Sequence, residues 1–253
     1  MINTLQASPC RHPKNAARLL RSLPLLGLLF IATPLFAAEP PQQIQASYQI
    51  LKSGLQIGKI EEVFSREKEH YTLVSTTSAT GLLALFRSEK IIAKSSGALN
   101  DAGFQPQLFD YRRGLDSSKD IRAQFDWDKR QLTLFLAARA QDVLSLPAGT
   151  QDRLSAMYQF MFLPLQSANI LDFYMSNGSK LDQYRYSIRR NQKVATPLGN
   201  LDAIYLDSLY KPGETRTQIW LASKYRNLPA KMIVTDGKGD QLTQILSNIV
   251  ITP

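Results

Sequence analysis

The stretch Glu214–Ile251, ETRTQIWLASKYRNLPAKMIVTDGKGDQLTQILSNIVI, predicts three consecutive β-strands. In each predicted strand, successive side chains alternate between two faces. In the first strand, one face carries Thr215, Thr217, Ile219 and Leu221. The run Asp236-Gly237-Lys238-Gly239 separates the second strand from the third. Alternation interrupted by Asp-Gly is the strongest short-range hairpin signal in a sequence. We therefore predict a β-rich fold with tight turns.

The remaining chain repeats this pattern. A strand with one wet face is expected from Ile44 to Ile50, and Gly58 in the next strand predicts a bulge or a close backbone approach. Further strands are expected at 57–64, 70–79, 88–99, 107–113, 121–125 and 132–136. Beyond the helix described below, strands are expected at 170–175 and 181–188, on either side of an Asn177-Gly178 hairpin turn, and within 194–209, which contains another turn at 198–200. No βαβ alternation occurs. The predicted fold class is all-β with one helix, an antiparallel meander curled into an open or closed barrel-like sheet.

One helix is predicted between Thr150 or Asp152, either of which can cap it, and Pro164, which ends it. An apolar stripe recurs at three- and four-residue steps through Leu154, Met157, Tyr158, Met161, Phe162 and Leu165. We expect this helix to cover one side of the curved sheet. The segment Gly81–Phe86 is apolar without strand alternation and is expected to be a helical turn or a loop at an opening.

The N-terminus has the pattern of a secretory signal peptide. Arg11, Lys14, Arg18 and Arg21 precede an apolar run of 14 residues, 23–36, which ends at small residues. The run is too short to favour a transmembrane anchor. We predict cleavage after Ala37, export to the periplasm, a flexible leader at 38–43 and one β-barrel-like domain at 44–253.

Removing residues 1–37 changes the composition. Lys plus Arg falls from 30 to 26 while Asp plus Glu stays at 21, so the formal net charge falls from +9 to +5. The only cysteine, Cys10, and one of two histidines, His12, also lie in this segment. Cysteine catalysis and disulfides are thereby excluded from the predicted mature chain. We expect a protein that does not span the membrane and does not bind nucleic acid.

Catalytic, cofactor and metal motifs are not recognisable in the predicted mature chain. His70 lies in a charged run at an expected hairpin tip, where a solvated residue is the simpler interpretation than a general base. Asp126 and Asp128 flank Trp127 in what reads as a turn rather than a metal site. A pair of carboxylates for glycoside cleavage cannot be picked out by spacing. We therefore assign no catalytic, cofactor-binding or metal-binding residue.

Basic residues form clusters at Arg112-Arg113 and Arg189-Arg190. Cations on edge strands commonly oppose aggregation. The functional alternative is contact of these four arginines with anionic phospholipid, lipopolysaccharide or acidic glycan. Methionine and aromatic residues on the predicted helix either pack the core or line a cavity for an apolar chain.

Several motifs resemble the domain-of-unknown-function family DUF3108 of exported proteobacterial proteins. They are Gly54–Gly58, Phe125-Asp126-Trp127, Gln151–Gln159, Thr196–Gly199, Ile219–Ala222 with Leu228-Pro229, and the last Gly-bearing hairpin. The resemblance covers nearly the whole chain after residue 37 and implies a periplasmic, curled antiparallel sheet without an established activity. Asp152, Ser155 and Tyr158, with Trp220, are either a ligand site or the means of docking the helix on the sheet.

The sequence leaves three functions open. We expect non-catalytic binding of an apolar or amphipathic envelope molecule: a lipid, lipopolysaccharide or glycan. The alternatives are an envelope scaffold or protein-interaction module, which would expose an apolar patch, and a carboxylate-dependent hydrolase of envelope glycans.

Overall fold

The structure is a computed structural model that describes residues 39–81, 84, 89–114 and 116–253. Its fifteen strands and the short helix α2 (Ser155–Gln159) follow one another along the chain. The strands are β1 (Gln43–Lys52), β2 (Leu55–Glu67), β3 (His70–Ala79), β4 (Ile91–Asn100), β5 (Gly103–Arg113), β6 (Ile121–Asp126), β7 (Gln131–Leu136), β8 (Arg139–Ser145), β9 (Gln151–Asp152), β10 (Ile170–Ser176), β11 (Leu181–Thr196), β12 (Gly199–Ser208), β13 (Arg216–Ala222), β14 (Leu228–Thr235) and β15 (Gln241–Thr252).

All fifteen strands belong to one sheet, in the order β8-β7-β6-β5-β4-β3-β2-β1-β15-β14-β13-β12-β11-β10-β9. Neighbouring strands are antiparallel except β9 and β10, which are parallel. Gln43 of β1 lies opposite Thr252 of β15, so the first and last strands pair in the middle of the sheet. The predicted antiparallel meander and the three strands of the stretch 214–251 are confirmed.

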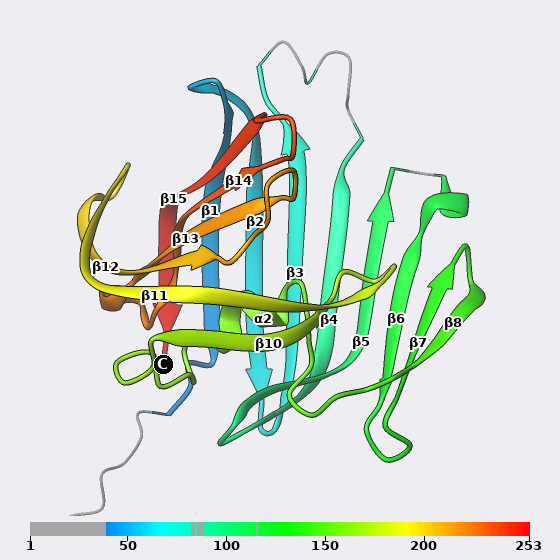
Figure 1. Cartoon of the computed structure of the whole chain (residues 1–253). Coiled ribbons are helices and arrows are strands. Elements are labelled where there is room, and N and C mark those ends of the chain that lie inside the picture. The colour runs from blue at the N-terminus through cyan, green and yellow to red at the C-terminus, as the bar shows by residue number, and fades with distance from the viewer. Residues whose placement is uncertain (1–38, 82–83, 85–88, 115) are drawn as a thin grey trace, which may run out of the picture. The chain divides into compact units, whose positions relative to one another are not determined.

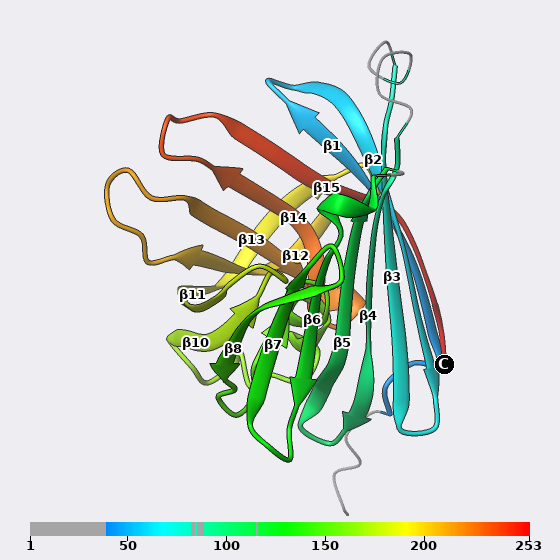
Figure 2. The same cartoon turned by 90° about the vertical axis from the view of Figure 1, so that its right-hand side faces the viewer.

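The sheet curls so that its two halves face each other. In Figure 1, β10 and β11 cross in front of the upright strands β1 to β4. Figure 2, turned by 90°, shows the strands β10 to β15 spreading to the left, away from β3, β4 and β5. We call β1–β8 the N-terminal wall and β10–β15 the C-terminal wall.

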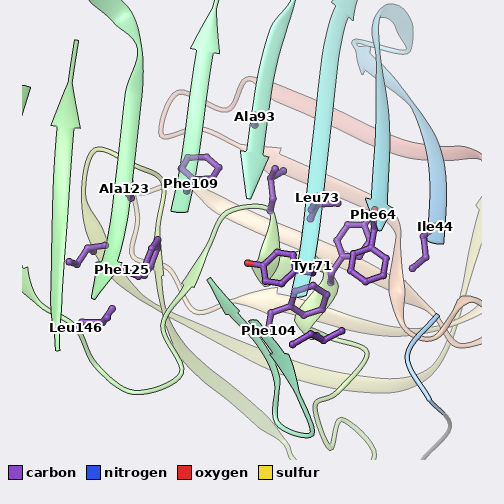
Figure 3. Packing of buried hydrophobic residues seen from close by; sticks show 14 of the residues in the cluster. Ile44, Phe64, Tyr71, Leu73, Ala93, Phe104, Phe109, Ala123, Phe125 and Leu146 are labelled. Atoms are coloured by element: carbon purple, nitrogen blue, oxygen red, sulfur yellow. The ribbon is translucent and has the colours of Figure 1, made fainter. Parts of the chain in front are cut away.

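Alternating side chains of each wall point inward and form two main hydrophobic cores. The N-terminal wall contributes Ile44, Phe64, Leu73, Phe104 and Phe125, among others, to the first core. Rings of Phe64, Tyr71 and Phe104 meet edge to face in this core, with centroids 5.7 and 4.7 Å from that of Phe104 (Figure 3). The C-terminal wall contributes Ile188, Ile204, Leu206, Ile219 and Leu221 to the second core.

The segment containing α2 lies between the two cores. Leu154 and Tyr158 belong to the first core, whereas Phe160 and Leu165 belong to the second. Met157 packs against both cores. The segment therefore holds the two walls together, as the expected helical cover of a curved sheet would.

The helix is shorter than predicted, because it spans Ser155–Gln159 rather than the residues from Thr150 or Asp152 to Pro164. Beyond it, the amides of Met161 and Phe162 donate to the carbonyls of Tyr158 and Gln159, which are three residues back. Bonds of this span belong to tight terminal turns. The apolar stripe is divided between two cores, so packing on two sides replaces a regular helical face.

Gly58 and the closing hairpin behave as their sequences predict. The β1–β2 register shifts at Ile50 and Leu51, which is the expected bulge, and a Cβ on Gly58 would lie 2.9 Å from the carbonyl oxygen of Ser78. In the last turn, the Asp236 carboxylate accepts the amides of Lys238 and Asp240.

The expected flexible leader at 38–43 is shorter in the structure. β1 begins at Gln43, and the Gln42 amide already donates to the Thr252 carbonyl, so pairing starts within the expected leader. The predicted signal peptide at 1–37 and most of the apolar segment 81–86 lie outside the described residues. Among the residues that are described, no helix is long and apolar enough to cross a membrane.

Candidate binding cleft

A cleft of about 520 Å³ opens where the two walls meet beside α2. Its lining comes from the end of β4 and the start of β5, the β6–β7 turn, the segment before β9, α2 and its following turn, β10 and the start of β11. The margins of both hydrophobic cores reach this cleft, since Phe104 of the first core and Phe160 of the second line it. Its volume falls within the range of small-molecule sites.

Apolar side chains from both cores line part of the cleft. They are Phe104, Trp127, Phe160, Leu163, Leu171 and Phe173. Phe104 and Phe160 are fully or almost fully buried members of the first and second cores, respectively. Trp127 is held by its indole N–H, which donates to the Pro106 carbonyl oxygen at 2.7 Å. An apolar group entering the cleft would therefore contact surfaces that the fold already keeps rigid.

Polar side chains line the remainder, and most are carboxamides. They are Asn100, Gln105, Gln151, Gln159, Asp172, Tyr174 and Gln183. Gln159 is tied to the β4–β5 hairpin, since its Oε1 accepts the Phe104 amide and its Nε2 donates to the Ala102 carbonyl. The cleft thus presents neutral donors and acceptors beside its apolar surfaces.

Gln151 is the most deeply buried of these amides, with 3% of its surface exposed. Its Nε2 donates to the Phe104 carbonyl at 2.8 Å and to the Gly149 carbonyl at 3.3 Å. Its Oε1 has no hydrogen-bond partner among the described residues. A buried acceptor without a partner costs free energy, and an ordered water can complete its hydrogen bonding.

A separate set of buried polar groups docks the α2 segment on the N-terminal wall. Asp152 is fully buried, and its Oδ1 accepts the backbone amides of Leu154 and Ser155 at 2.8 and 3.0 Å. Its Oδ2 accepts the hydroxyl of Ser95 on β4, whose oxygen is also 2.8 Å from the Tyr71 hydroxyl. Burial raises the pKa of Asp152, while these donors oppose the shift.

Glu62 on β2 forms the second half of this docking cluster. Tyr158 of α2 donates to Glu62 Oε2 at 3.1 Å, and Ser75 of β3 donates to Oε1 at 3.3 Å. Burial raises the Glu62 pKa from 4.5 to about 7, against the lowering effects of both hydrogen bonds and of Arg153. The pKa of Tyr158 is also raised, chiefly by burial.

The structure brings Asp152, Ser155 and Tyr158 together but not with Trp220. The first three lie on the face of the α2 segment that contacts the N-terminal wall. Trp220 lies on β13, where its ring centroid is 4.7 Å from that of Tyr205 and Lys231 Nζ is 5.4 Å from its centroid. None of the four residues lines the cleft.

The four arginines named for anionic contact divide between two strands. Arg112 and Arg113 lie at the exposed end of β5, and Arg112 is 4.0 Å from Asp120. Arg189 of β11 lies over the Tyr205 ring and bonds to Asp207 at 3.4 Å. Arg190 donates to the carbonyls of Leu165 and Ala168 and so ties the chain after α2 to β11.

Sequence reasoning missed the residues that line the cleft and the role of Glu62. Gln105, Gln151, Gln159 and Gln183 belong to four different segments, and no local motif connects them. One signal did exist for Glu62, because it occupies the inward register of β2 between Ile60 and Phe64. In the described ranges, no group of three or more His, Cys, Asp or Glu residues could hold a metal ion.

The comparisons with known proteins bear on the fold and the family. Curated proteins give no significant match. The chain is similar in fold to a β-barrel-like protein of the domain of unknown function DUF1849 from Brucella abortus, with 12% identity, a TM-score of 0.53, and coverage of 84% of this chain and 99% of that one. A protein with a YmcC-like fold from Bacteroides fragilis matches at 10% identity and a TM-score of 0.29, covering 83% and 97%, which is too low to carry an argument.

The family assignment has independent support from the sequence. The motifs from Gly54 to the closing hairpin occur in order, and the family model described as "Protein of unknown function (DUF3108)" matches residues 43–246. This match runs from the first residue of β1 into β15 and so spans the sheet. The chain belongs to the DUF3108 family.

Proposed function

We propose that the protein binds an apolar or amphipathic molecule of the cell envelope, a lipid, lipopolysaccharide or glycan, without catalysing a reaction on it. The observation that carries this proposal is the open cleft beside α2, where the margins of two hydrophobic cores meet a rim of mostly neutral polar side chains. Sites of this size, mainly apolar with a few placed polar groups, are typical of small-molecule binding.

The lining favours binding over hydrolysis. Asp172 is the single carboxylate among the described residues that line the cleft, whereas glycosidases of the common kinds place two carboxyl groups across the bond that is cleaved. Glu62 and Asp152 are buried, and each carboxylate accepts hydrogen bonds from at least two protein groups. Their oxygens accept the hydrogen bonds that dock the α2 segment on the N-terminal wall.

A scaffold function receives less support from the surface. The exposed large apolar side chains are distributed over several strands, among them Leu55 of β2, Leu136 of β7, Val143 of β8 and Val250 of β15. Single exposed apolar residues are normal for a protein surface.

The envelope location in this proposal depends on the signal peptide predicted at residues 1–37. Export followed by cleavage would give a mature chain that begins at Ala38. Mass spectrometry of protein from the periplasmic fraction tests this directly, because a chain that retains residues 1–37 or remains in the cytoplasmic fraction would contradict it.

Binding is tested with the neutral apolar fluorophore N-phenyl-1-naphthylamine. Leu163→Trp fills the cleft and is expected to weaken binding by about tenfold. Leu136→Trp is the matched control, because Leu136 is 45% exposed on β7 and does not line the cleft. Equal affinity in the wild type and both variants would refute the proposed site. Native mass spectrometry of the purified protein would identify a co-purifying ligand.

A further inference from the structure

We infer that the cleft recognises an uncharged, hydroxyl-rich head group, that is, a neutral saccharide, on an amphipathic ligand. This inference rests on the proposed function and narrows its ligand to an amphipathic molecule with a neutral glycan head group. Three features of the lining carry it: its charge, its carboxamides and the exposed edge of β10.

The charge of the lining excludes an anionic head group as the preferred ligand. Among the described residues that line the cleft, none is Lys, Arg or His. The one charged side chain is Asp172, which Arg185 and Gln183 already engage: Arg185 Nη2 is 2.9 Å from Asp172 Oδ2, and Gln183 Nε2 is 2.7 Å from Oδ1. Phosphate and carboxylate groups are recognised by cations and charge-assisted bonds, which this lining does not supply.

The carboxamides of the cleft match hydroxyl groups. Each Asn or Gln side chain both donates and accepts, as each hydroxyl does. Five of them line the cleft, and of these Asn100 and Gln183 are exposed. A site built to bond hydroxyls discriminates strongly, since a ligand that lacks them leaves its buried polar groups unpaired.

The edge of β10 adds backbone groups to the same wall. Successive side chains of a strand point to opposite faces, yet the four consecutive residues 171–174 all line the cleft. The strand therefore borders the cleft along its edge. On that side β9 pairs with β10 only at Met175 and Ser176, and the described residues provide no strand beside 171–174. Backbone N–H groups there can donate to ligand hydroxyls, and backbone C=O groups can accept hydrogen bonds from them.

Matched dodecyl probes separate these possibilities. Dodecyl maltoside is uncharged and rich in hydroxyls, dodecyl phosphate is anionic, and the dodecyl methyl diether of octaethylene glycol is uncharged and, having no hydroxyl, only accepts hydrogen bonds. Each probe displaces N-phenyl-1-naphthylamine from the full mature protein below its micellar concentration. We expect the maltoside to bind about tenfold more tightly than either other probe. Equal affinities, or tighter binding of the phosphate, would overturn the inference while leaving the proposed function intact.

A fourth probe tests the competing occupant of the β10 edge. A dodecanoyl-Ala-Ser-Ala-Ser amide could add a strand to this edge, as extended peptides do in other proteins. Tighter binding of this peptide than of the maltoside would overturn the saccharide inference. Failure of every probe to displace the fluorophore would instead defeat the proposed function itself, so the two failures are distinguishable.

A matched pair of variants locates the head group. Gln105→Ala is expected to weaken maltoside binding by about fivefold and to leave binding of the octaethylene glycol diether unchanged. Gln107→Ala is the control, since Gln107 is exposed two residues further along β5 and does not line the cleft. An equal change for both probes in Gln105→Ala would show that the amide does not bind the head group and would overturn the inference.

Discussion

The α2 segment has polar groups on two sides, and these two sets differ in how their hydrogen bonds are completed. On the N-terminal wall, the carboxylates of Asp152 and Glu62 accept bonds from Ser95, Ser75, Tyr158 and backbone amides. In the cleft, Gln151 Oε1 has no partner among the described residues, and Gln105 and Gln183 lie on an open surface. The difference teaches that burial and perturbed pKa values mark the docking cluster, whereas the candidate ligand site is marked by neutral amides that face an open cleft.

The largest effect is expected from removing the carboxylate that docks the segment. Asp152→Ala leaves the buried amides of Leu154 and Ser155 and the hydroxyl of Ser95 without this acceptor. Each unsatisfied buried group costs about 1–3 kcal/mol, so we expect a loss of about 4 kcal/mol in the free energy of unfolding. Urea denaturation followed by circular dichroism measures it.

Two further variants control for the loss of charge and of side-chain volume. Asp152→Asn keeps an oxygen that can accept both backbone amides, and its cost should be about 2 kcal/mol smaller. Asp142→Ala, on the exposed strand β8, should change the free energy of unfolding by less than about 0.5 kcal/mol. If Asp152→Ala were as mild as Asp142→Ala, the docking role would be excluded.

The next effect is a pH dependence caused by Glu62. Its pKa is about 7 in the folded protein against 4.5 for a solvent-exposed glutamate, which represents the unfolded state, so the folded state keeps a proton that the unfolded state releases in this interval. The free energy of unfolding therefore falls as pH rises from 4.5 to 7, by roughly 3 kcal/mol from this group. Denaturation midpoints between pH 4 and 8 measure the slope.

Glu62→Gln should remove most of this slope and stabilise the protein above pH 7. Some decrease with pH should persist, because burial also raises the pKa of Asp152. Glu61→Gln is the matched control, since Glu61 is the neighbouring exposed residue of β2. A Glu62→Gln profile that keeps the full wild-type slope would show that Glu62 does not titrate in this range.

A smaller effect should follow from removing one hydroxyl. Tyr158→Phe keeps the ring against Phe64, whose centroid is 5.8 Å away, but deletes the bond to Glu62. We expect a loss of about 1.5 kcal/mol and a further rise in the Glu62 pKa, because that bond lowers it. Tyr210→Phe, at an exposed position, should change neither quantity. An unchanged pH profile in Tyr158→Phe would contradict the coupling between these residues.

Much of the fold could be predicted from the sequence because alternation and turns are local. The Asp236-Gly237 and Asn177-Gly178 turns lie where their side chains satisfy the turn amides, and the strands around them follow the expected alternation. β8 was missed because nearly all its residues are exposed and no apolar alternation marks it. The helix was overestimated because its apolar residues serve two cores.

The candidate site was much less accessible to such reasoning. Asp152, Ser155 and Tyr158 were recognisable as a group because they are close in sequence, and the structure places them in the docking cluster. The cleft is assembled by the curling of the sheet, which brings Asn100, Gln151 and Gln183 from distant segments to one place. No spacing of these residues in the sequence indicates that they lie close together in the fold.

The smallest stability effect is expected in the cleft, and it completes the contrast between the two sides. Gln105→Ala and Gln183→Ala remove amides that contribute to no buried network, so each should change the free energy of unfolding by less than about 0.5 kcal/mol. The same urea titrations used for Asp152→Ala measure them. A loss above about 2 kcal/mol in either variant would mean that the cleft amides are structural, and the division between a docking side and a ligand side would then fail. Small losses in stability together with weakened maltoside binding by Gln105→Ala would instead separate the two sides by measurement.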